Sequence, residues 1–171
     1  MRKACKLLKP LSFLLVLTLA FFYVFSVPSF AIVTKQKCRH NLEGKAYYNT
    51  LKLSAKIQKP IFRPGEDVKV DVNLSNIGQY FVNLYFSSSQ QFDLVVEDMQ
   101  GNEVYRWSKG MMFAQAITSV TLQPNQSISQ QFSFKLANKG FYRIKGETAK
   151  MYFNQLPSTT LITTPILILV R

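Results

Sequence analysis

The chain has 171 residues, 13% aromatic side chains and a formal net charge of +12. This length suits one domain with accessory segments. Because the basic residues are scattered, with no aromatic-interleaved basic stripe, no nucleic-acid partner is expected. The positive charge is compatible with plain solubility or with an acidic partner or anionic surface.

The first 31 residues have the pattern of an export signal. Basic residues precede an apolar stretch at residues 11–27, and the small residues Ser29 and Ala31 follow it. This A-x-A-like pattern predicts cleavage after Ala31. An uncleaved anchor helix is the alternative, since residues 11–33 are long enough to span a bilayer. Either way, the expected location is secreted or anchored to the outer face of the cytoplasmic membrane, with membrane contact only through this segment.

Residues 32–50 are polar and aperiodic, which predicts a linker, partly ordered at its end. The linker contains His40, the only histidine, and Cys38, the only cysteine that would remain after cleavage. An internal disulfide is therefore not expected. Whether Cys38 is a free thiol or an intermolecular link stays open, and the oligomeric state is not predicted.

From residue 51 to residue 171 the sequence predicts a β-domain. Apolar and polar residues alternate over residues 51–57 and 68–74, which is the period of a half-buried strand. Further strands are expected at residues 81–86, 92–96, 103–108, 128–134, 141–144 and in the tail at 161–170. Short strands with turn signals every 8–12 residues or so predict an all-β sandwich or barrel.

The side chains needed for catalysis are scarce. The chain has nine carboxylates, and two of them, Asp93 and Glu97, alternate with apolar residues, which predicts that they make the outer face of a strand. Zinc-ligand spacing, a calcium loop, a phosphate-binding glycine loop and a nucleophile elbow are all missing from the sequence. We therefore expect no catalytic, cofactor-binding or metal-binding residue, and no enzyme.

One stretch of the domain is distinctive. Residues 88–98 read SSQQFDLVVED, residues 101–108 read GNEVYRWS, and residues 110–116 read GMMFAQA. This order resembles the BsuPI family of bacterial intracellular proteinase inhibitors, which show a Ser-Gly-Gln-like start, Phe-Asp, an acidic turn with glycine, Val-x-Arg-Trp-Ser and Met-Phe-x-Gln-Ala. The resemblance covers roughly residues 51–150.

The resemblance implies an immunoglobulin-like antiparallel β-sandwich over residues 51–171 and inhibition of subtilisin-like serine proteases, here outside the cytoplasmic membrane. A cell-surface or secreted protein-binding module with the same fold and no protease partner is the alternative. Two features depart from the family. Its namesake acts inside the cell, whereas an export signal is predicted here, and Ser88-Ser89-Gln90 stands where the family has Ser-Gly-Gln.

An inhibitor commonly offers an extended segment to the protease cleft. Residues 87–91 are small and polar, and residues 108–114 carry two methionines whose flexible apolar side chains could fill a pocket. The structural alternatives are an ordinary connector and a segment tucked into the end of the sandwich. The candidate protease-contact residues are Ser88, Ser89, Gln90, Lys109, Met111 and Met112.

Other residues of the motif have expected structural roles. Arg106 should face away from Trp107 and pair with Asp93 or Glu97 across a hairpin, a contact worth roughly 0.2–1 kcal/mol. Large apolar rings favour the core, and the expected core residues of the motif are Phe92, Trp107 and Phe113.

Overall fold

The computed structural model of the protein describes residues 42–153 and 157–171, which form twelve β-strands and no helix. The all-β prediction is confirmed for these residues. Within them, no helix is long and apolar enough to cross a bilayer. The predicted signal or anchor at residues 1–31, together with Cys38 and His40, lies outside the described residues.

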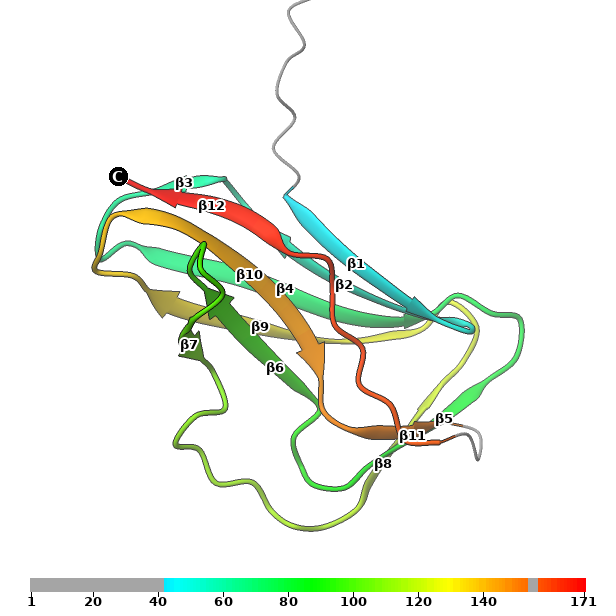
Figure 1. The fold of residues 1–171 in the computed structure, drawn as a ribbon. Helices are drawn as coiled ribbons and strands as arrows, with labels where there is room; N and C mark the ends of the chain where they lie inside the picture. Colours follow the sequence, from blue (N-terminus) through cyan, green and yellow to red (C-terminus); the bar gives the residue numbers. More distant parts are fainter. Residues whose placement is uncertain (1–41, 154–156) are drawn as a thin grey trace, which may run out of the picture. The chain divides into compact units, whose positions relative to one another are not determined.

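The strands form three sheets (Figure 1). Sheet A has the order β1-β2-β4-β9, sheet B the order β3-β12-β10-β6-β7, and sheet C the order β11-β5-β8. All pairings are antiparallel except that of β12 with β3. The strands are β1 (Glu43–Tyr48), β2 (Leu51–Ile57), β3 (Ile61–Phe62), β4 (Asp67–Asn76), β5 (Val82–Phe86), β6 (Phe92–Glu97), β7 (Glu103–Arg106), β8 (Thr118–Leu122), β9 (Ser127–Lys135), β10 (Gly140–Thr148), β11 (Met151–Phe153) and β12 (Ile166–Val170).

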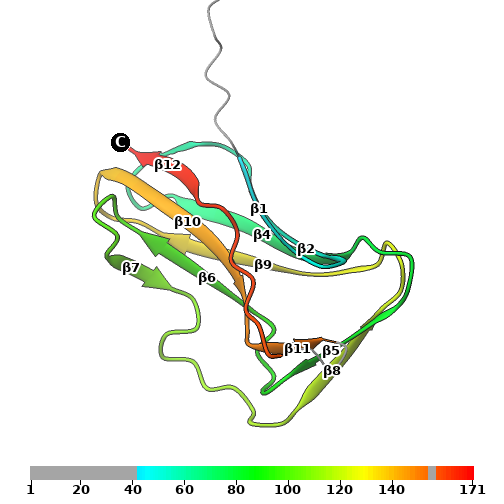
Figure 2. The ribbon, with the colours of Figure 1, turned by 45° about the vertical axis from the view of Figure 1, so that its right-hand side comes forward.

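Sheets A and B pack face to face as a β-sandwich, and sheet C lies at one end, at the lower right in Figures 1 and 2. Gly146 of β10 shows how close the two layers are. A Cβ atom there would lie 3.0 Å from a methyl group of Val72 and 3.1 Å from that of Ala55. The backbone of β10 therefore rests directly on side chains of β2 and β4.

The predicted alternation produces the core. On β4, Val68, Val70, Val72 and Leu74 are all buried, while the side chains between them face the outside of sheet A. Such burial stabilises the fold by about 25 cal/mol per Å² of apolar surface removed from water. The neighbouring strand β9 adds Phe132 from the same inner face, because Phe132 is directly opposite Val70.

The end of the predicted linker belongs to the sandwich instead. Residues 43–48 form β1, which pairs along its whole length with β2. Gly44 is buried because its backbone lies against the carbonyl oxygen of Thr164, where a Cβ atom would overlap that oxygen. The amide of Lys45 also donates to the hydroxyl of Thr164 at 3.1 Å. These partners are more than a hundred residues away, so a local sequence pattern could not reveal them.

The apolar tail is a strand only in its second half. β12 begins after Pro165, which has no N–H to donate to a ladder. It then lies inside sheet B, parallel to β3 and antiparallel to β10. Residues before Pro165 make an isolated bridge between Ile162 and Glu147.

Candidate functional site

The carboxylate of Asp93 lies where the chain leaves the β6–β7 hairpin. The backbone N–H of Ser108 donates to its Oδ1 at 3.0 Å, and the hydroxyl of Ser108 donates to its Oδ2 at 2.6 Å. The guanidinium of Arg106 donates to the same Oδ2 at 2.9 Å. Asp93 was expected on an exposed outer face. It does point outward from sheet B, but Arg106 and Ser108 cover it and leave 5% of the residue exposed.

Arg106 joins three carboxylates from three strands. Besides Asp93, its side chain donates to Glu103 at 2.8 Å and to Glu147 at 3.2 Å. Burial acts to lower the pKa of the Arg106 guanidinium, but the hydrogen bonds that it donates to Glu103, Asp93 and Glu147 outweigh burial and raise that pKa above its usual range. The predicted pairing with Asp93 is confirmed, whereas Glu97 pairs with Lys145 instead.

Trp107, the next residue of the motif, makes two aromatic contacts. Its ring lies edge-on to the ring of Phe132 with centroids 5.0 Å apart, and tilted against Phe113 at 5.8 Å. Trp107 and Phe113 are both half-buried, and Trp107 packs against the core. Of the three aromatic residues expected in the core, only Phe92 is fully buried there.

The connecting segment, residues 107–117 between β7 and β8, bulges away from the strands along the lower edge in Figures 1 and 2. Two turn hydrogen bonds shape its start, from the N–H of Lys109 to the carbonyl of Arg106 and from the N–H of Met111 to that of Ser108. Gly110 has φ of 81°, a left-handed conformation that glycine adopts readily. Beyond this turn, Met112 is 99% exposed, and Met111 is 47% exposed.

The two candidate loops lie against each other. The N–H of Ser89 donates to the carbonyl of Ala114 at 3.0 Å, and the N–H of Ala114 donates to the hydroxyl of Ser89 at 3.1 Å. The hydroxyl of Thr118 donates to the carbonyl of Ser88 at 2.9 Å. Gln90 does not reach the segment, because its side-chain amide donates back to the carbonyl of Phe92. The connecting segment is thus held at both ends, while residues 109–112, its tip, project between them.

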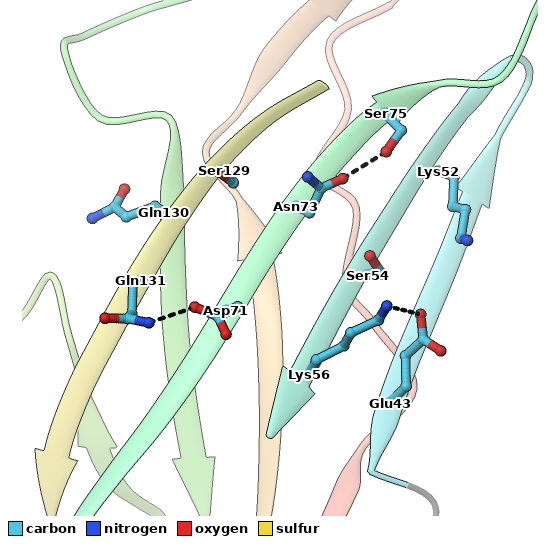
Figure 3. A pocket seen from close by; sticks show the side chains of 10 residues that line it. All are labelled: Glu43, Lys52, Ser54, Lys56, Asp71, Asn73, Ser75, Ser129, Gln130 and Gln131. Carbon is cyan, nitrogen blue, oxygen red and sulfur yellow. Dashed lines mark hydrogen bonds and ion pairs between the residues drawn. The ribbon is translucent and has the colours of Figure 1, made fainter. Parts of the chain in front are cut away.

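A second surface feature is a polar hollow of about 510 Å³ on the outer face of sheet A (Figure 3). Several of its side chains bind one another, among them Lys56 with Glu43 and Gln131 with Asp71. Such mutual pairing is typical of the solvated face of a sheet. The residues lining it are Glu43, Lys52, Ser54, Lys56, Asp71, Asn73, Ser75, Ser129, Gln130 and Gln131.

The described residues offer little for catalysis. Residues 42–153 and 157–171 contain no histidine and no cysteine. In the same ranges, no group of three acidic, histidine or cysteine side chains could hold a metal ion. Hydrogen bonds from Asn102 to Asp98, and from Lys59 to Glu66, lower the pKa of these carboxyl groups. A general acid needs the opposite shift.

Residues 55–152 match the BsuPI family, described as intracellular proteinase inhibitor. This match spans more than half of the chain, and the protein therefore belongs to the BsuPI family. The family is one of inhibitors, not of enzymes, and its description implies a protease as partner.

Two solved structures are among those similar to the chain. The C-terminal domain of Wzt is 12% identical, with 75% of this chain and 78% of that chain covered and a TM-score of 0.48. The sporulation control protein Spo0M from Bacillus subtilis is 17% identical, with 72% and 50% covered and a TM-score of 0.41. No curated protein matches the sequence significantly.

The family description corrects the predicted location. The sequence of residues 1–31 predicts an export signal, and the domain was therefore expected outside the cytoplasmic membrane. The family is described as intracellular, which points to the cytoplasm and contradicts a secreted or surface-anchored protein. A basic, apolar amino-terminal pattern was the only basis for the expected export, and those residues lie outside the described part of the chain.

Proposed function

We propose that this protein inhibits a subtilisin-like serine protease by presenting Met112, at the tip of the connecting segment, to the substrate cleft. The observation that carries the proposal is the 99% exposure of an apolar side chain on a segment tethered at both ends. A large apolar side chain held in water has no role in the stability of the fold. Methionine is common at surfaces that bind other proteins.

The mode of binding follows from the way in which proteases hold extended chains. A cleft pairs with the main chain of its ligand and receives alternate side chains in pockets. Methionine is unbranched and polarizable, so it adapts to the shape of an apolar pocket. Lys109 and Met111 precede Met112 on the same tip. Because the segment is already ordered by its tethers, less conformational entropy is lost on binding.

The loop at residues 87–91 has a supporting role in this proposal. Ser88 and Ser89 hold the far end of the connecting segment through the hydrogen bonds to Thr118 and Ala114. We further infer an immunoglobulin-like arrangement for the sandwich. The four- and five-stranded sheets packed face to face support it.

The test is a titration of purified full-length protein against a panel of subtilisin-like proteases. We expect stoichiometric loss of activity for at least one protease, and Met112→Asp should weaken inhibition about 100-fold, because a charge would have to enter an apolar pocket. Met99→Asp is the matched control, since Met99 is 49% exposed in the β6–β7 turn. Inhibition equal in both variants and the unaltered protein would exclude the tip, and no inhibition of any protease in the panel would refute the proposal.

A protein-binding module without a protease partner is the second candidate, and one observation favours it. Tyr85 and Tyr152 are paired opposite each other on sheet C and are 44% and 47% exposed. Exposed tyrosines are enriched in protein interfaces. If Tyr85→Ser and Tyr152→Ser leave protease inhibition unchanged, this face contributes nothing to inhibition.

A further inference from the structure

The Phe-Asp and Arg-Trp-Ser parts of the family motif converge on one buried carboxylate. Asp93 belongs to β6, and Ser108 is the second residue after β7 ends. Ser108 gives Asp93 both of its donors, one to each carboxylate oxygen. A residue held through its backbone and its hydroxyl at once cannot rotate freely, so this contact fixes the direction in which the chain leaves the hairpin.

The charge on Asp93 is itself held in place. Arg106 donates to the oxygen that also accepts the hydroxyl of Ser108, and the amide of Leu94 donates to the other oxygen at 2.8 Å. Hydrogen bonds to an ionised acceptor are roughly twice as strong as those between neutral groups. An asparagine at this position would direct an amide N–H₂ group at donors, so the contact requires a carboxylate.

The tip is a short step away from this contact. Lys109, Gly110, Met111 and Met112 follow Ser108 directly, and the N–H of Met111 closes its turn on the carbonyl of Ser108. A displacement of Ser108 would therefore move the whole tip. The opposite end of the segment is held separately, by the hydrogen bonds between Ala114 and Ser89.

We propose that Asp93 is a positioning residue for target binding: by holding Ser108, it sets the course of residues 109–112 and keeps them ordered before a protease is met. This inference rests on the proposed inhibitory function. It assigns the Asp-Arg-Ser part of the motif to the geometry of the tip, in addition to its place in the fold. Asp93 itself is covered and does not touch the target.

The decisive variants change Ser108, because Asp93→Asn can unfold the protein. Ser108→Ala removes the hydroxyl donor and leaves the backbone donor, and Ser108→Thr restores a hydroxyl. Ser119→Ala is the matched control, since Ser119 is an exposed serine on β8. All are made in the full-length chain, and the thermal unfolding midpoint of each is measured alongside.

Two readouts separate order at the tip from inhibition. The first is tryptic cleavage of the bond after Lys109, measured by mass spectrometry against the bond after Lys139, an exposed lysine that also precedes a glycine. The second is the inhibition constant for the protease found in the panel. We expect Ser108→Ala to raise the cleavage ratio and weaken inhibition by about tenfold each, as the loss of one hydrogen bond to a charged group allows, and Ser108→Thr to restore both.

Each outcome decides a different point. An unchanged cleavage ratio in Ser108→Ala would overturn the ordering role of Asp93. A raised ratio with unchanged inhibition would show that order at the tip does not serve target binding, and would overturn the inference while leaving the inhibitory function standing. If the unaltered protein inhibits no protease, the proposed function fails and the role in target binding fails with it. The cleavage ratio then still decides whether Asp93 orders the tip.

Discussion

The sandwich and the connecting segment are held together by opposite means. In sheets A and B, apolar side chains on alternate positions are buried between the layers, and the residues of β4 are typical. In the segment at residues 107–117, backbone N–H groups donate hydrogen bonds to Asp93 and Ser89, while two methionines face water. Packing spreads the stabilising free energy over many residues, whereas at a tether a single contact determines the position of the backbone. Changes in the core should therefore alter stability first, and changes at the tethers should alter binding first.

The largest expected effect on stability lies in the core. Phe92→Ala removes a ring that is 1% exposed and should lower the free energy of unfolding by about 3–5 kcal/mol, because the cavity left behind collapses only in part. Phe81→Ala is the matched control, because Phe81 lies just before β5 and is 57% exposed. This substitution should lower the free energy of unfolding by less than about 0.5 kcal/mol. Denaturant titration measures both. Equal losses in the two variants would contradict the division between core and surface.

Much of the sandwich could be predicted from the sequence, because its strands follow local patterns. Alternation over residues 68–74 marked β4 and its buried face. Asp93 shows where the pattern ends. Alternation gave the face correctly, but burial depended on Arg106 and Ser108 folding back over it.

The candidate site could be predicted only as two separate loops. Residue types singled out Ser88–Gln90 and the methionines, but nothing local indicated that Ser89 and Ala114 would bind each other. The same holds for β1, whose polar sequence suggested a linker. Its strand depends on β2 and on the backbone around Thr164. Long-range contacts decide both cases.

An intermediate effect on stability is expected from a substitution in β1, and it tests whether β1 is a structural part of the sandwich. Gly44→Ala would push a Cβ atom into the carbonyl oxygen of Thr164, and we expect a loss of about 1–3 kcal/mol in the free energy of unfolding. Hydrogen exchange of the β1 amides should rise with it. Tyr47→Ala, at a side chain 61% exposed on the same strand, should change neither quantity. If hydrogen exchange of the β1 amides is unchanged in Gly44→Ala, residues 43–48 behave as a linker and not as a strand of the sandwich.

The smallest effect concerns a turn that holds itself together, in contrast to the tip. Asp98 accepts hydrogen bonds from the side-chain amide of Asn102 and from the backbone N–H groups of Asn102 and Gln100. The side-chain amide of Asn102 is the largest cause of the lowered pKa of the Asp98 carboxyl, and the backbone donors lower it further. A carboxyl group whose pKa is lowered by folding stabilises the fold at pH values above its pKa in the unfolded chain. This contribution is lost as the pH falls through the pKa of the group in the folded protein.

Asn102→Ala should therefore raise the pKa of Asp98 toward its ordinary value, measured by NMR titration of the carboxyl group. Asn138→Ala, at an exposed asparagine between β9 and β10, should leave that pKa unchanged. The group is exposed, so the global stability should hardly respond. Both turns contain a glycine with positive φ, Gly101 and Gly110. The first is closed by its own aspartate, whereas the second depends on Asp93 from a neighbouring strand. If Asn102→Ala weakened inhibition as much as Ser108→Ala, the tip would depend on the whole hairpin and not on its tether at Asp93.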